Sequence, residues 1–553
     1  KGSNTTAMDN QRLILFVALS FVLLLIWQAW VEDYGQKPQP VSTEAVTTPP
    51  AVDTAADLPS EIPEPGAALP RIQDEFLPSS QRIQVQTDVL SVEIDTTGGD
   101  IRKVDLLQYP VSIKSDSGPV RLISDEPPDF FVAQSGLRTP DGEEPTHHAI
   151  YEAEQTEYRL SDSNDLIEVP LRWRSPEGVL VDKIFTFRRG SYVIDVVHQV
   201  SNQSESDWRG RQYRQLQRTD ETKDSGNQFI ITYTGGVIYS PEEKYEKINF
   251  DDMVDEDLSR EITGGWAAMI QHYFLAAWIP PGEESDQYYS KVINGPRYVL
   301  GMISPYLTVP AGSDASFSSR FYVGPKLQDV MAEVAPGLEL TVDYGILTVL
   351  SQPLFWMLDK IYKLVGNWGW AIVLLTLLIK LAFYKLSETS YRSMANMRKL
   401  TPRLKSLKER YGDDKQRLNQ AMMELYKTEK INPLGGCLPI LVQIPVFIAL
   451  YWVLLESVEL RQAPFILWIK DLSSPDPYFV LPLLMGATMF IQQKLNPAPV
   501  DPMQAKIMML LPVVFTVFFA FFPSGLGLYL VANNSLSSAQ QWMITRRIEM
   551  GGK

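Results

Sequence analysis

A single lysine lies inside an apolar stretch that is almost long enough to cross a membrane. The stretch, from Trp368 to Tyr384, reads WGWAIVLLTLLIKLAFY and contains Lys380 near its end. A crossing takes about 20 residues, and at a rise of ~1.5 Å per residue Lys380 lies roughly 18 Å beyond Trp368. A charge at that depth on an isolated helix costs from about 3 to more than 10 kcal/mol. We therefore expect Lys380 either to snorkel to the nearer interface or to face a wet cavity inside a helix bundle.

Other polar residues accompany this lysine within apolar runs. Thr376 and Tyr384 lie four residues before and after Lys380, so a continuous helix would place all three on one face. Each polar residue alone is explained by a hydrogen bond between helices. Together with a lysine, they favour a hydrated concavity. The polar residues of the later runs are Gln443, Asn533, Asn534, Ser537 and Gln540.

Six apolar runs predict a multi-pass α-helical membrane protein with six crossings. Arg12 precedes the first run, while Glu32 and Asp33 follow it, so the positive-inside rule places the N-terminus in the cytoplasm. A cleaved signal peptide is the alternative, although the run is long for one. The basic loops all fall on the same side, so both termini are expected inside the cell. The predicted crossings are residues 8–31, 367–386, 433–456, 477–493, 506–522 and 523–545.

Between the first two crossings, the sequence predicts a large domain outside the cytoplasm. Residues 32–75 are rich in Pro, Ala, Thr and Glu and are typical of a disordered linker. Residues 76–330 show short alternating strands separated by turns, which indicates an all-β sandwich. Residues 331–366 are expected to return the chain through an amphipathic helix at the outer interface, or alternatively to pack on the sandwich. Residues 1–7 precede Met8 and are interpreted as an expression remnant.

Residues 387–432 are expected to form a helical hairpin in the cytoplasm. From Lys385 to Lys430 there are twelve Lys or Arg residues against six Asp or Glu residues. Gly412 suits the end of one helix, and Asp413 or Asp414 suits the N-cap of the next. The charge is explained by a solvated face, and the alternative is contact with ribosomal RNA or anionic lipid. The remaining segments are an outside loop (457–476), an inside loop (494–505) and a cytoplasmic tail (546–553).

The composition argues against several classes of function. The 553 residues carry a formal net charge of −16 but include one cysteine and four histidines. An intramolecular disulfide is therefore impossible, and a structural zinc site is not expected. No glycine-rich phosphate-binding motif lies on a strand-turn-helix. We expect no catalytic residues, no metal and no cofactor, and we expect no DNA partner.

Several sequence blocks closely resemble the YidC family of membrane protein insertases. Together with the anchor and the outside domain, they are similar to the Gram-negative form within the YidC/Oxa/Alb group, and the resemblance spans almost the whole chain. Several blocks in order are far more specific than any one alone. The blocks are Val365–Trp370, Tyr411–Gln416, Asn432–Cys437, Ser457–Phe465, Asp501–Gln504 and Phe522–Leu526.

The resemblance implies an insertase core of five helices that encloses a hydrophilic groove. In the family the groove is open to the cytoplasm and to lipid, and a basic residue in it receives the polar part of an incoming protein. Lys380 stands at that position, where many relatives have arginine; lysine keeps the charge but not the bidentate fork. Thr376 and Tyr529 also match groove positions, whereas Leu530 is often tyrosine in relatives. The implied substrate groove is Lys380, Thr376, Tyr384, Gln443, Tyr529, Asn533 and Asn534.

The resemblance also implies the partners and the place of action. An inner membrane insertase and chaperone would act on nascent membrane proteins in the lipid bilayer, alone or with the Sec translocon, and the hairpin would meet the ribosome. In relatives the outside domain resembles a sugar-processing β-supersandwich and contacts the Sec machinery. Two alternatives remain from the residues themselves. A secondary transporter would also hold a charge in a bundle, and a membrane-anchored carbohydrate enzyme would use the sandwich.

Overall fold

The computed structural model describes residues 58–59, 77–220, 232–293, 297–412, 414–429, 438–496 and 502–550. All of them belong to the larger of two units of the chain, residues 53–553. The predicted first crossing, residues 8–31, lies outside the described residues, as does most of the predicted linker.

The first part of the described chain folds into two large β-sheets. Alternating sequences form the strands because successive side chains point to opposite faces. In Val179–Arg188, for example, every second residue from Val179 is buried. Residues of both sheets, among them Val92, Val104 and Val196, fill the core between them. The prediction of a large all-β domain is confirmed, and a short helix, α2 (Phe250–Asp255), lies within it.

The two sheets are almost entirely antiparallel; among the described strands, only β1 and β7 pair in parallel. The eleven-stranded sheet has the order β14 (Ser259–Thr263), β17 (Ser285–Ile293), β18 (Arg297–Ile303), β11 (Trp208–Thr219), β5 (Phe131–Arg138), β3 (Asp100–Pro110), β2 (Leu90–Asp95), β1 (Arg82–Gln86) and β7 (Glu157–Arg159), with β19 (Leu307–Val309) beside β11 and β4 (Pro119–Ile123) beside β3. The nine-stranded sheet has the order β13 (Lys244–Ile248), β12 (Gly235–Ser240), β15 (Trp266–Gln271), β16 (Phe274–Ile279), β20 (Asp314–Pro325), β10 (Val193–Asn202), β9 (Val179–Arg188), β8 (Leu166–Arg174) and β6 (Glu152–Ala153).

Charged side chains are also buried between the sheets. Lys183 is 1% exposed, and its Nζ donates to the carbonyl oxygens of Gly98 (2.9 Å) and Ser135 (2.7 Å). Burial lowers the pKa of Lys183 to about 8. Arg214 is fully buried, and its guanidinium lies 3.1 Å from Asp286 Oδ2 and 2.6 Å from Glu284 Oε1. Such groups are tolerated in a core because each has partners that replace water.

The segment after the last strand contains a longer helix with apolar residues on more than one side. Phe355 and Leu358 are buried, whereas Trp356 and Leu364 are 61% and 84% exposed. An exposed apolar side fits the predicted amphipathic helix; its place at a membrane interface stays a prediction. The elements are α3 (Gln328–Val334), the 3₁₀ turns η1 (Leu338–Thr341) and η2 (Gly345–Leu347), and α4 (Thr348–Val365).

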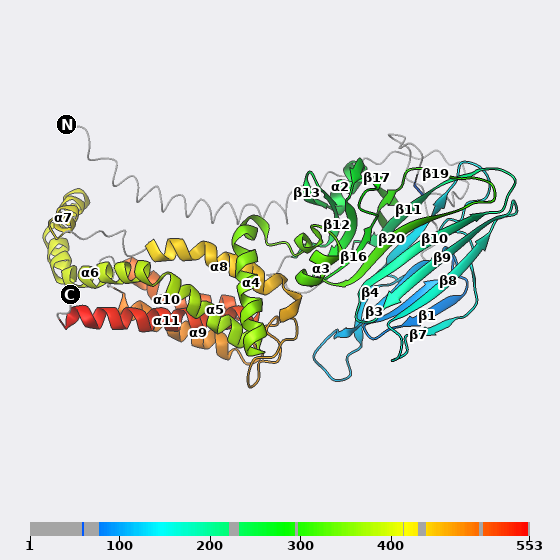
Figure 1. The fold of residues 1–553 in the computed structure, drawn as a ribbon. Coiled ribbons are helices and arrows are strands. Elements are labelled where there is room, and N and C mark those ends of the chain that lie inside the picture. Colours follow the sequence, from blue (N-terminus) through cyan, green and yellow to red (C-terminus); the bar gives the residue numbers. More distant parts are fainter. Residues whose placement is uncertain are drawn as a thin grey trace, which may run out of the picture. The chain divides into compact units, whose positions relative to one another are not determined.

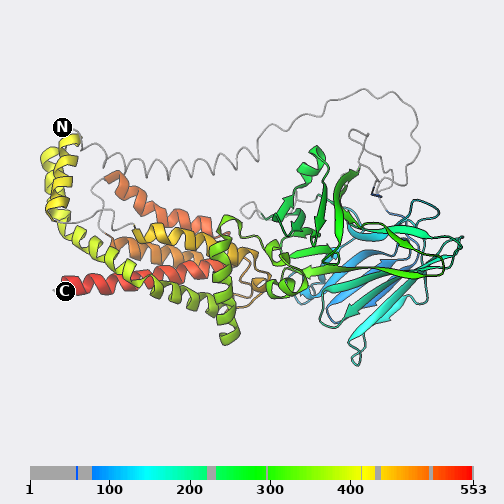
Figure 2. The same ribbon diagram turned by 45° about the horizontal axis from the view of Figure 1, so that its top comes forward.

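The rest of the described chain is helical, and in Figures 1 and 2 most of these helices lie side by side in a bundle beside α4. Within it, α11 packs against α5, α6 and α9, and α8 packs against α4. The helices are α5 (Trp368–Ala382), α6 (Tyr384–Tyr411), α7 (Lys415–Thr428), α8 (Leu438–Glu456), α9 (Val480–Leu495), α10 (Pro502–Phe519) and α11 (Ser524–Glu549), with η4 (Val458–Leu460) after α8. Across the described ranges, no helix alone is long and apolar enough to count as a membrane span, whereas α5 and α6 pass that test as a bent pair.

One break differs from the sequence-based expectation. The sequence predicts that the apolar stretch with Lys380 continues as a single helix to residue 386, but α5 ends at Ala382 and α6 begins at Tyr384 after a bend of 68°. Phe383 has left the helical region, with φ −91° and ψ 12°. Gln540 Nε2 donates to the carbonyl oxygen of Tyr384 at 3.3 Å and so supplies a partner for the backbone just after the break.

Candidate functional site

Lys380 lies where three helices of the bundle meet. Its Nζ donates to Ser537 Oγ of α11 at 2.7 Å and to Gln443 Oε1 of α8 at 3.2 Å. The side chain is half-buried. No carboxylate of the described chain lies within 4 Å of the ammonium. The charge is therefore solvated by neutral oxygens and has no counter-ion there, which leaves it able to attract an acidic group.

The partners of Lys380 are themselves joined. Gln443 Nε2 donates to Asn533 Oδ1, and Ser537 Oγ donates to the carbonyl oxygen of Asn533 at 2.7 Å. The buried ring of Tyr529 stacks on Phe447, with centroids 6.0 Å apart. Buried polar groups of this kind are expensive unless they are connected. The hydrogen bonds that link these side chains across α5, α8 and α11 therefore help to fix how the three helices pack.

The N-terminal end of α5 is held by the loop after α8. Asn367 caps the helix, because its side chain accepts from the Trp370 backbone at 3.1 Å and donates to the carbonyl oxygen of Phe465 at 3.2 Å. Gly369 permits this approach, since a Cβ there would lie 2.1 Å from the Phe465 ring. The residues Asn-Trp-Gly-Trp thus fix the position of α5 along its axis relative to the loop after α8, and with it the position of Lys380.

The other predicted groove residues have varied surroundings. Thr376 is 1% exposed, and its hydroxyl donates to the carbonyl oxygen of Ile372 at 2.7 Å. Tyr384 lies beyond the bend, so it does not continue the helix face of Thr376 and Lys380. Asn534 is half-buried beside Asn533. The structure thus joins Lys380 to Gln443 and Asn533, while Thr376 satisfies its hydroxyl within its own helix.

Ser537 is not among the predicted groove residues, although it is one of the polar residues of the last apolar run. It accepts the shorter of the two hydrogen bonds from Lys380. A signal existed, because Ser537 lies four residues after Asn533 and shares its helix face. The contact to Lys380 itself joins residues 157 positions apart, and no periodicity predicts such a pair.

A small cavity adjoins the lysine. Its volume of ≈ 10 Å³ is close to the least that holds one water molecule, about 10–15 Å³. Polar and apolar groups both line it: Ile379, Lys380, Phe383, Leu386, Ser387, Val442 and Gln443. In this state the site is a narrow polar contact between helices.

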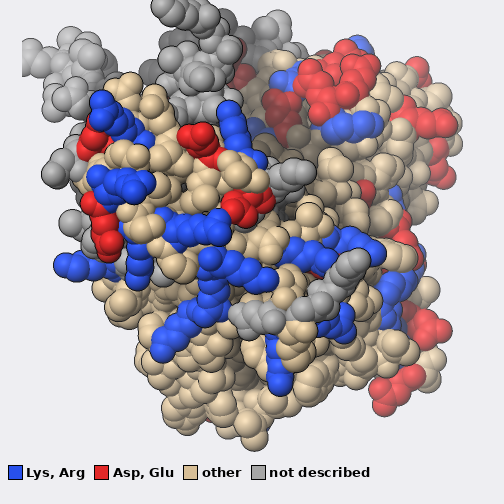
Figure 3. Space-filling view, turned by 90° about the vertical axis from the view of Figure 1, so that its left-hand side faces the viewer, with Lys and Arg blue, Asp and Glu red and all other residues tan. Residues whose placement is uncertain are grey.

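A basic surface covers the helical hairpin. α6 and α7 pack against each other, with Arg403 and Glu429 joined at 2.5 Å. Asp414, one of the two predicted caps, begins α7 by accepting from the Arg417 backbone at 3.0 Å. Figure 3 shows Lys and Arg gathered on this side with fewer acidic residues. The exposed basic residues are Lys385, Arg392, Arg398, Lys399, Arg403, Lys405, Arg410, Arg417 and Lys427.

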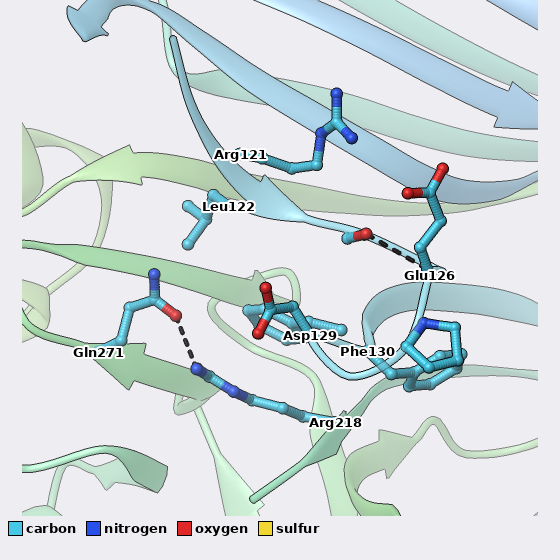
Figure 4. A pocket seen from close by; sticks show the side chains of 10 residues that line it. Arg121, Leu122, Glu126, Asp129, Phe130, Arg218 and Gln271 are labelled. Atoms are coloured by element: carbon cyan, nitrogen blue, oxygen red, sulfur yellow. Dashed lines mark hydrogen bonds between the residues drawn. The ribbon is translucent and has the colours of Figure 1, made fainter. Parts of the chain in front are cut away.

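A polar pocket of ≈ 310 Å³ lies in the β-domain. Figure 4 shows Asp129 between Arg121 and Arg218. Arg218 Nη2 donates to Gln271 Oε1 at 2.7 Å, and Arg121 pairs with Asp105 at 2.9 Å. A carbohydrate enzyme would need a site of this kind, but both arginines already serve contacts within the domain.

Comparisons with known proteins point to one family. A family model described as the YidC periplasmic domain matches residues 82–357, and one described as 60Kd inner membrane protein matches residues 360–551. A protein of Methylococcus capsulatus named membrane protein insertase YidC is 56% identical, over 98% of this chain and 99% of its own. One of the same name from Alkalilimnicola ehrlichii is 57% identical, over 98% and 96%. A crystal structure of an active YidC insertase is 19% identical, covers 85% of this chain and 94% of its own, and has a TM-score of 0.37.

Proposed function

The chain belongs to the YidC family of membrane protein insertases, and from this premise we propose that Lys380 and its polar partners receive the hydrophilic part of an incoming protein. The chain is an inner membrane protein with a periplasmic β-domain that acts on nascent membrane proteins. The observation that carries the proposal is the ammonium of Lys380, which is held by Gln443 and Ser537 without a carboxylate partner in the described chain.

We propose six crossings with both termini in the cytoplasm. The first is residues 8–31, and the others contain α5, α8, α9, α10 and α11. Two of these helices are short, since α5 and α9 have 15 and 16 residues, or roughly 23 Å of helix each at ~1.5 Å per residue. This is less than the ~30 Å of a typical hydrocarbon core, so the bilayer would thin around them.

In the proposed mechanism, a client's short polar tail enters the site while its apolar segment stays in lipid. Opening α5, α8 and α11 around Lys380 would admit water and the tail, which avoids much of the cost of moving polar groups through hydrocarbon. The lysine attracts acidic groups of the tail. At ~4 Å and an effective dielectric near 20, that attraction is about 4 kcal/mol before desolvation, enough to guide the tail without trapping it.

The driving force in this proposal is partition of the apolar segment into lipid. The segment would slide along α8 and α10, which present exposed apolar residues such as Ile444, Leu510 and Val517. Each central Leu, Ile, Phe or Val contributes about 0.3–0.6 kcal/mol. The mechanism makes and breaks no covalent bond, so it needs no catalytic residue and no cofactor.

Crosslinking to a stalled client tests this path. With Cys437 replaced by serine, a cysteine introduced at Ile444 or Leu510 is expected to crosslink to the apolar segment of a ribosome-stalled nascent chain. A cysteine introduced at Ile150, a 66% exposed residue of the β-domain, is the control. Equal crosslinking at all three positions, or none at Ile444 and Leu510, would contradict the proposed path.

We also propose that the basic hairpin meets the ribosome in the cytoplasm, and that the β-domain works beside the Sec translocon. Neutralising Lys399, Arg403 and Lys405 together should weaken ribosome binding and flatten its salt dependence, because a surface that binds fewer phosphates releases fewer counterions. Cosedimentation with ribosomes between about 50 and 200 mM salt measures this slope, and a protein that neutralises about six phosphates typically binds roughly a thousandfold more weakly at the higher salt. If the dependence of ribosome binding on salt is unchanged, the basic residues of the hairpin only form a solvated surface.

A further inference from the structure

The turn between β15 and β16 contacts the end of a helix that lines the proposed groove. His272 Nε2 lies 3.1 Å from the carbonyl oxygen of Leu455, in the last turn of α8. Nearby, Lys326 Nζ lies 3.9 Å from Glu456 Oε2, and these two side chains are only 3% and 7% exposed. Two residues of the β-domain therefore meet the last two residues of α8.

These contacts suit the end of a helix. The last carbonyl groups of a helix lack internal partners, and its C-terminus carries a partial negative charge. A carbonyl oxygen only accepts, so His272 must carry its proton on Nε2. Burial lowers the pKa of His272 to about 4, so the ring stays neutral near pH 7 and donates one hydrogen bond. Lys326 places its amino group beside the same terminus; burial lowers the pKa of Lys326, while the charge of Glu456 acts in the opposite direction.

The loop after α8 is attached to the β-domain as well. Arg461 Nη2 and Gln462 Nε2 both donate to the carbonyl oxygen of Pro110, each at 2.8 Å. The Arg461 guanidinium also lies 5.6 Å from the centre of the Phe274 ring. The attachment therefore continues through the two residues that follow η4, and it involves both β-sheets.

We propose that His272 and Lys326 are positioning residues for insertion, which set the height and rotation of α8. Gln443, the α8 partner of Lys380, lies twelve residues before Leu455, or roughly 18 Å along the helix. α8 runs as one helix from Leu438 to Glu456, with Pro445 inside it, so an attachment at its C-terminal end bears on the position of Gln443. This inference rests on the proposed role of the Lys380 site. It means that the β-domain helps to position Gln443 relative to Lys380.

A distance measurement on the full chain tests the inference. In a Cys437→Ser background, spin labels are attached to cysteines introduced at Ile444 on α8 and Trp542 on α11, which are 45% and 50% exposed. His272→Ala with Lys326→Met should broaden or shift the distance distribution and slow client insertion several-fold in unlabelled protein. His272→Gln with Lys326→Arg, which keeps a donor and a cation, should restore both. Lys103→Met, which breaks a more exposed ion pair at 3.0 Å elsewhere in the domain, is the control for loss of a lysine charge.

The outcomes separate this inference from the proposed function. An unchanged distance distribution in the double variant overturns the positioning role, whatever the insertion rate. If Lys380→Ala inserts clients normally while the double variant still shifts the distance, the positioning role stands and the role of the lysine falls. Circular dichroism verifies that the β-domain is folded. If the double variant does not fold, the distance is measured in the single variant His272→Ala.

Discussion

Replacing Lys380 with alanine is expected to slow the insertion of clients with acidic outside tails by roughly 5- to 30-fold. The ammonium is held by Ser537 and Gln443 and has no carboxylate within 4 Å in the described chain. We take about 1–2 kcal/mol of the ~4 kcal/mol attraction to remain after desolvation, and this corresponds to a factor of roughly 5–30 in rate. Insertion into proteoliposomes, followed by protection of the outside tail from protease, measures the rate.

Two controls identify the charge as the cause. Lys380→Arg should keep most of the activity, because a guanidinium carries the same charge, although its shape and hydration differ. A client whose tail has Asn and Gln in place of Asp and Glu should be slowed much less by Lys380→Ala. Equal slowing of both clients would point to packing of α5, α8 and α11 in place of attraction, and full activity of the alanine variant would remove Lys380 from the mechanism.

The second large effect is expected in the β-domain, where Arg214→Met should destabilise the fold by about 3–5 kcal/mol. Arg214 and Asp286 are both 0% exposed and lie 3.1 Å apart. Removing the arginine leaves Asp286 buried without its cation, which costs more than the pair itself contributes. Since ~1 kcal/mol shifts the melting temperature of a 150–250-residue domain by about 2–4 °C, a decrease of roughly 6–20 °C should follow.

The exposed pair of Arg172 and Asp182, at 2.7 Å on neighbouring strands, supplies the comparison. Arg172→Met should cost about 1 kcal/mol or less, because exposed pairs are weak. Adding Asp286→Asn to Arg214→Met should recover part of the stability, since the uncompensated charge is then gone. Thermal unfolding of the full chain in detergent, followed by the β-sheet signal, gives these values. A destabilisation by Arg214→Met no larger than that by Arg172→Met would mean that water reaches Asp286.

The sequence predicted those features that local pattern determines. Alternation along strands such as β9 indicated the sandwich, and Asp414 was one of two residues expected to cap α7, where it accepts from the Arg417 backbone. Lys380 was singled out because a charge in an apolar run requires solvation. Each of these inferences needs residues only a few positions apart.

What the sequence did not predict depends on distant residues. The hydrogen bond from Arg461 to Pro110 joins positions 351 apart, and that from Lys380 to Ser537 joins positions 157 apart. The break at Phe383 follows a run of good helix formers, with no glycine or proline from Ala371 to Ser387 to announce it. The contact from Gln540 to Tyr384, which lies at that break, joins residues 156 positions apart.

The break between α5 and α6 has a mechanical consequence. If α5 and α6 were one straight helix, a force on the hairpin would be carried along the helix axis to Lys380. Here the helix axis changes direction at Phe383, three residues after Lys380, and the two segments meet at 68°. We expect a force on the hairpin to act first on the contacts of α6 with α11, and not directly on the hydrogen bonds of Lys380 to Gln443 and Ser537.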